Sequence, residues 1–294
     1  MNTDSILVLG ATGKVGLQVV KALKKRGATV KALVRDVAKA QGQLPEGVAL
    51  LAGELESRAS LDRALWGVDK VFLSTPNTLS QVTAEKAVID AAKAAGVKHI
   101  VKLSGGSAHQ ASPVRIARWH GELERYLEAS GLAYTHLQPE FFMQNLLGAA
   151  TSIARGRLAM PLGVAQMGLV DVRDIAAVAA GTLTEPGHEG KTYRITGPEA
   201  LTMTQIAQVF SEQLDHQVVY EPLTAEAFIT QLTGWSVPEW SAAALAEVFV
   251  SVAAGNANFT TDVVETVGKV EPHTFADFVR DHIKVFAGQP QPAA

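Results

Sequence analysis

The sequence predicts an α/β fold in which a doubly wound parallel sheet is joined to a smaller, mostly helical C-terminal lobe. Two observations support this prediction. Apolar runs of strand length alternate with segments of helical period through the first half of the chain, and a glycine-rich turn joins the first run to the first helical segment. The chain has 294 residues, and at about 150 residues for an average domain this length allows about two units.

The predicted elements alternate from the first residues onward. The expected strands are Ser5–Leu9, Thr29–Arg35, Val48–Leu51, Lys70–Ser74, His99–Leu103 and Ala133–Leu137. The expected helices, each with apolar residues at steps of three and four, are Lys14–Arg26, Ser60–Trp66, Ser80–Ala95 and Ile116–Ser130. Gly96 and Gly131 follow two of these helices, where a left-handed cap residue is favoured. Alternation of this kind predicts right-handed crossovers and therefore parallel strands.

Beyond about residue 151 the alternation becomes less regular. The elements expected there are a helix over Thr204–Leu214, a strand over Gln217–Tyr220 and mainly helical structure from Thr224 to Phe286. This change in pattern predicts two domains. Their expected bounds are residues 1–155 for the sheet-containing domain, with residues 170–198 returning to it, and residues 199–294 for the smaller lobe.

Composition limits the classes of function. There are 26 Lys and Arg against 29 Asp and Glu, a net charge of −3 without any basic run, so neither nucleic acid nor a membrane surface is an expected partner. The cysteine count of 0 excludes disulfides, thiolate metal sites and cysteine nucleophiles. No apolar stretch reaches the about 18 residues of a membrane span, and no His or carboxylate cluster indicates a catalytic metal. With 47% hydrophobic and 19% charged residues, a cytoplasmic globular protein is expected.

The glycine-rich turn has the sequence Gly10-Ala11-Thr12-Gly13-Lys14-Val15-Gly16. It lies between the first predicted strand and the first predicted helix, where glycine lets the backbone approach phosphate oxygens and the helix N-terminus faces their charge. All seven residues are therefore candidate contacts for a dinucleotide, and the predicted sheet is of the Rossmann type. The alternative is a tight turn in which glycine serves packing alone.

Arg35 and Asp36 follow the second predicted strand, at the place that distinguishes the two nicotinamide cofactors. In NAD-binding proteins an acidic residue there usually holds the ribose 2′-hydroxyl, whereas arginine accommodates the 2′-phosphate of NADP. A guanidinium pairs with phosphate in bidentate geometry, and Lys14 adds a second cation. NADP(H) is therefore the favoured cofactor, with NAD(H) kept open by Asp36 and a merely solvated Arg35 as the alternative.

Three further loops end predicted strands at the same carboxyl edge of the sheet, where ligands of open α/β sheets bind. They contribute the candidate cofactor contacts Glu54, Leu55, Ser74, Thr75, Pro76 and Ser104. Ordinary turn formation explains each of these loops equally well when it is considered by itself.

The motifs together resemble those of a known family. Besides the glycine-rich turn, the resemblance rests on Val34-Arg35-Asp36, Val101-Lys102-Leu103-Ser104, His120-Gly121-Glu122-Leu123-Glu124, Ser130-Gly131-Leu132-Ala133-Tyr134-Thr135, Pro139-Glu140-Phe141-Phe142-Met143-Gln144-Asn145, Gly187-His188-Glu189-Gly190-Lys191-Thr192-Tyr193 and Leu201-Thr202-Met203-Thr204. These segments resemble the NmrA-like group of atypical short-chain dehydrogenases/reductases, and within it the NAD(P)H:quinone oxidoreductases and triphenylmethane-dye reductases. The resemblance covers nearly the whole chain.

The chain lacks the tyrosine and lysine pair of typical short-chain dehydrogenases. None of the 4 tyrosines is followed four positions later by lysine, so proton donation to a ketone by that pair is not expected. His120 stands in the lysine position and Ile116 in the tyrosine position, which resembles the quinone- and dye-reductase branch. We predict His120 as the catalytic residue, donating to the cofactor ribose or nicotinamide or to an oxyanion on the acceptor. An ordinary helix histidine is the alternative.

The resemblance also implies a substrate pocket after the sixth strand. Phe141, Phe142 and Asn145 are the predicted substrate contacts, with Phe142 stacking on an aromatic ring and Asn145 bonding a carbonyl. Two adjacent phenylalanines are equally often plain core. The lobe that carries Trp235 and Trp240 is expected to close the pocket.

We therefore predict an NADPH-dependent oxidoreductase that passes a hydride to a quinone or a related planar conjugated acceptor. Hydride addition to such an acceptor gives an aromatised or charge-neutralised product, so positioning supplies most of the catalysis. Two alternatives remain open: an NmrA-type redox sensor that binds NAD(P) and a partner protein without turnover, and a biosynthetic reductase of a polycyclic metabolite. The sequence also leaves open whether the chain forms a homodimer.

Overall fold

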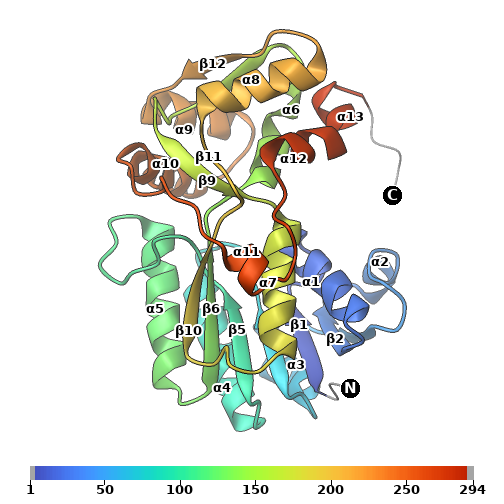
Figure 1. Ribbon diagram of the computed structural model, residues 1–294. Coiled ribbons are helices and arrows are strands. Elements are labelled where there is room, and N and C mark those ends of the chain that lie inside the picture. The colour runs from blue at the N-terminus through green and yellow to red at the C-terminus, as the bar shows by residue number, and fades with distance from the viewer. Residues whose placement is uncertain (1–3, 290–294) are drawn as a thin grey trace.

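The computed structural model describes residues 4–289 and confirms the predicted α/β fold class. A sheet with helices on both faces forms the lower half of Figure 1, and the C-terminal lobe lies above it. The sheet has the order β10-β6-β5-β4-β1-β2-β3, and all neighbouring strands in it are parallel. Its strands are β1 Ser5–Leu9, β2 Thr29–Val34, β3 Ala49–Ala52, β4 Lys70–Leu73, β5 His99–Leu103, β6 Ala133–Pro139 and β10 Lys191–Ile195.

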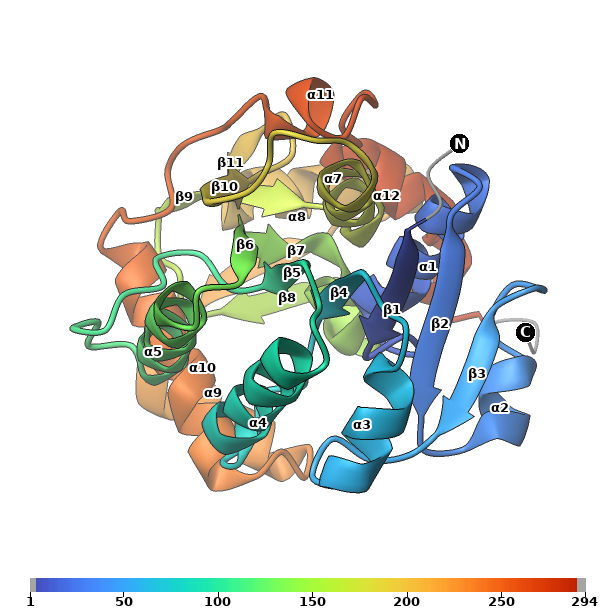
Figure 2. The same ribbon diagram turned by 90° about the horizontal axis from the view of Figure 1, so that it is seen from below.

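Two groups of helices cover the two faces of this sheet. Figure 2 shows α3, α4 and α5 along one face and α7 with α1 on the other, and α1 packs closely against α7. The helices of the sheet region are α1 Lys14–Lys25, α2 Val37–Gln41, α3 Arg58–Leu65, α4 Gln81–Ala94, α5 Arg115–Ala129, α7 Val172–Thr184 and α11 Val263–Thr266. The sheet is therefore buried on both sides, as its nearly continuous apolar strands require.

The predicted strands and helices of the first half are all present, with ends that differ by one or two residues. Gly96 and Gly131 have φ of 75° and 81°, which confirms the predicted left-handed caps. Three elements of the sheet region were not predicted, namely α2, α7 and β10. Helix α2 is short, and β10 lies far along the chain from β6, its partner in the sheet.

The C-terminal lobe contains more strand than the sequence predicts. β9 lies between β11 and β7 in one small sheet, and β8 pairs with β12 in another. The predicted strand over Gln217–Tyr220 is shifted to Val219–Pro222, and a loop interrupts the predicted helical region beyond residue 254. No helix within residues 4–289 is long and apolar enough to cross a membrane. The elements of this half are β7 Phe141–Phe142, η1 Met143–Ala149, α6 Ala150–Ile153, β8 Arg157–Met160, β9 Gln166–Val170, β11 Ala200–Thr202, α8 Met203–Leu214, β12 Val219–Pro222, α9 Ala225–Gly234, α10 Glu239–Ala253, α12 Phe275–Asp281 and α13 Ile283–Phe286.

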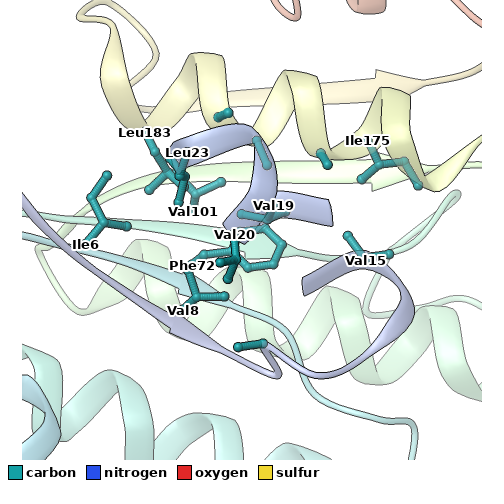
Figure 3. Close-up of a cluster of buried hydrophobic side chains, with 14 of the residues drawn as sticks. Ile6, Val8, Val15, Val19, Val20, Leu23, Phe72, Val101, Ile175 and Leu183 are labelled. Carbon is teal, nitrogen blue, oxygen red and sulfur yellow. The ribbon is translucent and has the colours of Figure 1, made fainter. Parts of the chain in front are cut away.

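The apolar face of the amphipathic helix α1 packs into the core between α1 and the sheet. Val15, Val19 and Leu23 recur at the helical period on α1 and are buried against the sheet, while Ile175 of α7 lies on the same cluster (Figure 3). Burying such a side chain contributes about 1.5–3 kcal/mol. The orientation of α1, and with it the position of the glycine-rich turn, is therefore set by this cluster.

His136 in β6 is a buried polar side chain whose protonation should affect the stability of the fold. Its ring stacks on Tyr134 with centroids 4.7 Å apart and the side chain is fully buried. Neither ring nitrogen makes a hydrogen bond within residues 4–289, although Nε2 lies 3.4 Å from Oε1 of Glu128. Burial lowers the pKa of His136 from 6.5 to about 3. The unfolded chain therefore binds a proton more readily, and the stability that the neutral ring contributes above pH 6.5 is lost as the pH falls.

We expect His136→Phe to remove this part of the acid sensitivity while keeping a ring against Tyr134. Between about pH 7.5 and about pH 5, the wild-type free energy of unfolding should fall by about 2 kcal/mol more than that of the variant. Urea titrations at both pH values measure the difference. Equal losses in the two proteins would show that His136 titrates normally when folded.

Candidate active site

The turn between β1 and α1 accepts only glycine at two positions. Gly10 has φ of 72°, and a Cβ atom there would lie 2.5 Å from the carbonyl oxygen of Ser74 at the end of β4. A Cβ atom on Gly16 would overlap the carbonyl oxygen of Gly10. No side chain caps the N-terminus of α1, and the first turn of α1 carries no acidic residue. The backbone N–H groups at this helix end therefore face the carboxyl edge of the sheet and suit an anion.

The other residues of the turn divide between core and surface. Ala11 and Val15 are buried in the cluster beneath α1, whereas Thr12, Gly13 and Lys14 are exposed. Side-chain donors at this end of the turn therefore come from Thr12 and Lys14. Ala11 and Val15 shape the turn from below.

Arg35 and Asp36 follow β2 and are both exposed, but their side chains are engaged differently. Oδ1 of Asp36 accepts a hydrogen bond from the backbone N–H of Lys39 at 3.0 Å, so Asp36 is the N-cap of α2. The Arg35 guanidinium has no hydrogen-bond or ion-pair partner among the described residues. A structural role accounts for Asp36, and Arg35 remains available to a ligand.

The loops after β3 and β4 bring their predicted cofactor contacts to the carboxyl edge of the sheet. One of these residues, Thr75, turns its hydroxyl toward the protein interior. The hydroxyl of Thr75 donates to Oε1 of Glu85 at 2.5 Å, so this hydroxyl binds the protein. The predicted contacts that are exposed or half-buried in these loops are Glu54, Leu55, Ser74, Thr75 and Pro76.

A cavity of about 320 Å³ lies beyond the carboxyl ends of β5 and β6. It brings together the predicted catalytic residue, one predicted cofactor contact and the three predicted substrate contacts. These residues are His120, Ser104, Phe141, Phe142 and Asn145. Two other hollows lie on the C-terminal lobe and contain none of the predicted site residues. The cavity beyond β5 and β6 is therefore the candidate active site.

Helix α10 closes this cavity. Its inward face supplies apolar side chains to the wall, among them Leu245, Phe249 and Val252. The two tryptophans of the lobe are not in the wall: Trp235 is 52% exposed, and Trp240 lies against Trp119 of α5, with ring centroids 6.2 Å apart. The lobe therefore closes the pocket as expected, but through an aliphatic and phenyl face that the sequence reasoning missed.

The hydroxyl proton of Ser104 is used in a hydrogen bond within the protein. Its Oγ donates to Oε1 of Glu124 at 2.5 Å, and Gln138 donates to both oxygens of the same carboxylate. Burial raises the pKa of Glu124, against the opposing effect of the hydrogen bonds from Ser104 and Gln138. Toward the cavity, Ser104 is therefore left with acceptor capacity only.

His120 projects from α5 to the cavity wall beside Gly105. Its Nδ1 lies 3.4 Å from Nζ of Lys102, and Nε2 has no hydrogen-bond partner within residues 4–289. Burial and, to a smaller extent, the Lys102 ammonium lower the pKa of His120 to about 3, against the opposing effect of the Glu85 carboxylate. The ring is therefore neutral near pH 7, when it can donate a hydrogen bond but is not an imidazolium acid.

Glu140 adds a carboxylate to the cavity wall that the sequence reasoning did not select. It forms an ion pair with Arg194 of β10, whose guanidinium lies 4.0 Å from the ring centre of Phe259. Burial raises the pKa of Glu140, and the hydrogen bond from Arg194 opposes the shift. Asn77 and Asn256, also in the wall, were likewise missed, because each lies in a loop without a motif. No group of three His, Asp or Glu side chains in residues 4–289 is arranged to hold a metal ion.

Two named proteins are similar to this chain over nearly their whole length. NAD(P)H azoreductase of Xenophilus azovorans is 43% identical over 285 residues, which cover 96% of this chain and 99% of that protein. Quinone oxidoreductase 2 of Escherichia coli (strain K12) is 34% identical over 254 residues, which cover 85% and 88%.

Two solved structures are also similar to this chain over nearly its whole length. The Escherichia coli NADPH-dependent quinone oxidoreductase complexed with NADPH has a TM-score of 0.87 and 32% identity, covering 95% of this chain and 99% of that one. The Citrobacter sp. triphenylmethane reductase complexed with NADP(H) has a TM-score of 0.84 and 28% identity, covering 94% and 99%. The model of the NmrA-like family matches residues 2–279. The chain therefore belongs to the NmrA-like family.

Proposed function

We propose that this protein is an NADPH-dependent oxidoreductase that transfers a hydride to a quinone or a related planar conjugated acceptor. The observation that carries the proposal is the cavity that joins His120, Phe141, Phe142 and Asn145 at the carboxyl edge of the sheet. Ligands of open α/β sheets bind at this edge. The names of the azoreductase, quinone oxidoreductase and triphenylmethane reductase relatives agree with such an acceptor.

The residues of the glycine-rich turn suit a dinucleotide. Glycine is required at Gly10 and Gly16, and the uncapped N-terminus of α1 offers N–H groups to a diphosphate. Arg35 and Lys14 would hold a 2′-phosphate, which favours NADPH, because the nearby carboxylate of Asp36 is already the N-cap of α2. When bound, NADPH supplies the hydride and leaves as NADP⁺.

The cavity supplies orientation more than acid catalysis. Phe141 and Phe142 form flat apolar walls that align a ring and exclude water. The neutral ring of His120 is placed to donate a hydrogen bond to the oxygen or nitrogen of the acceptor that gains negative charge, and the remaining proton then comes from solvent. Ser104 donates its hydroxyl proton to Glu124, so its oxygen would be left to accept a hydrogen bond from the cofactor amide or from the reduced product.

Arg35→Ala tests the preference for NADPH. Loss of a charge-assisted contact to the 2′-phosphate should raise the Kd for NADPH about 10- to 100-fold and leave the Kd for NADH within about twofold. Titration calorimetry with each cofactor measures both constants. Arg125→Ala is the matched control, because Arg125 lies on α5 with its side chain 69% exposed and paired with Glu128. Equal effects of Arg35→Ala on both cofactors would contradict the assignment.

Turnover with a panel of quinones, azo dyes and triphenylmethane dyes tests the reaction itself. We expect NADPH oxidation with at least one of these acceptors, and His120→Ala should lower kcat about 10- to 100-fold, near the lower end of the loss from removing an oxyanion donor. The Kd for NADPH should change little. NADPH binding without oxidation by any acceptor would favour the non-catalytic redox sensor instead.

A further inference from the structure

A fully buried ion pair lies directly beneath His120. Nζ of Lys102 on β5 lies 2.6 Å from Oε2 of Glu85 on α4, and these side chains are 0% and 1% exposed. Glu85 also accepts hydrogen bonds from Thr75 at 2.5 Å and from Gln81 at 3.1 Å. Both members of the pair are therefore held in one geometry by the surrounding sheet and helix.

Stability alone does not account for this pair. Removing two charges from water costs several kcal/mol per ion, and apolar residues of similar volume often replace such a pair without loss of stability. The pair also lies at a site where its field acts on a neighbour, because Nζ of Lys102 lies 3.4 Å from Nδ1 of His120. That neighbour is in the cavity wall.

We propose that Lys102, held in place by Glu85, fixes His120 as a neutral imidazole whose proton is on Nε2 and faces the cavity. A lysine ammonium carries only donors. A proton on Nδ1 would point at these N–H bonds across 3.4 Å, whereas the bare Nδ1 lone pair accepts from them. The single proton of the neutral ring is therefore on Nε2, which has no partner in the described part of the chain.

Charged side chains lie near His120 on several elements, but only the ammonium of Lys102 faces Nδ1. Lys102 contacts the ring from β5, and Glu85 lies behind Lys102 on α4. Glu124 lies one turn along α5 and is bonded to Ser104, while Glu140 in the cavity wall is paired with Arg194. Because each carboxylate is engaged elsewhere, the ammonium is the charge that faces Nδ1, and it opposes a second proton on the ring.

Lys102 and Glu85 are accordingly positioning residues, and their effect on turnover rests on the proposed function. A ring with a fixed Nε2–H presents one donor in one orientation to a hydride acceptor. With free exchange between tautomers, part of the population would present a lone pair there, which repels a developing negative charge. The ion pair removes that unproductive fraction.

The tautomer is measured by two-bond ¹H–¹⁵N correlation spectra of protein labelled with ¹⁵N-histidine. The chain has 8 histidines, and His120→Gln assigns the signals by their loss. We expect a proton-bearing Nε2 and an unprotonated Nδ1 for His120 between about pH 6 and about pH 8, where an ordinary histidine titrates. A protonated Nδ1, or an imidazolium in this range, would overturn the proposal whether or not any acceptor is reduced.

The charge-swapped variant Glu85→Lys/Lys102→Glu reverses the field at Nδ1. The carboxylate introduced at position 102 should draw the proton to Nδ1 and raise the pKa of the ring, so kcat should fall about tenfold or more at alkaline pH. It should recover as the pH falls and Nε2 is protonated again. If Nδ1 of the folded variant stays unprotonated, the proposal is wrong.

A neutral variant covers the case in which the swapped pair does not fold. In Glu85→Gln/Lys102→Met, Nδ1 faces no obligate donor, so signals of both tautomers should appear and kcat should fall while the Kd for NADPH is unchanged. Lys86→Met is the matched control on α4, since Nζ of Lys86 pairs with Glu122 at 2.6 Å. Spectra of His120 that are identical in wild type and neutral variant would overturn the proposal. An Nε2–H ring in a protein that reduces no acceptor would instead count against the proposed function alone.

Discussion

The pairing of β10 with β6 is the constraint on which the pocket depends. β6 leaves the sheet at Pro139, opposite Ile195 of β10, and the N–H of the next residue, Glu140, donates to the carbonyl of Ile195 at 3.0 Å. Arg194 on the same strand pairs with the Glu140 carboxylate. β10 follows α7 of the sheet region and lies more than 50 residues beyond β6, so a distant part of the chain holds the segment that carries the aromatic wall. The pocket is therefore built from both halves of the chain.

A series of packed elements also links the pocket to the glycine-rich turn. β7 of the aromatic wall pairs with β9, β9 leads into α7, and α7 packs along α1 behind the glycine-rich turn. Figure 1 shows β9 in the upper half of the molecule and α7 and α1 in the sheet region below it. A displacement of the lobe would therefore move the cavity wall together with α1, whose N-terminus is the proposed diphosphate site. This coupling suits hydride transfer, which depends on the distance between two bound partners.

Most of the fold follows from local pattern, and most of the site does not. The glycine-rich turn, Arg35 and the segment after β6 could be proposed from the sequence because each lies beside a predicted strand end. The α10 wall was missed because its apolar residues are equally consistent with plain core, and the two tryptophans drew attention by size alone. The contact of Lys102 with His120 joins residues 18 positions apart on different elements. Sequence periodicity places a residue on a face, but it does not say which charge lies across from it.

The buried lysine gives a physical reason for the absent tyrosine. An ammonium beside a phenol lowers its pKa and makes it a better proton donor, which a ketone needs. An ammonium beside an imidazole also lowers the pKa, but the result is a ring that stays neutral and only donates a hydrogen bond. An acceptor that becomes aromatic or loses a charge on reduction needs no stronger acid. The tautomer proposed for His120 beside Lys102 would give the site one fixed donor and little acidity, which suits the proposed acceptors, because their own electronic structure drives the reaction.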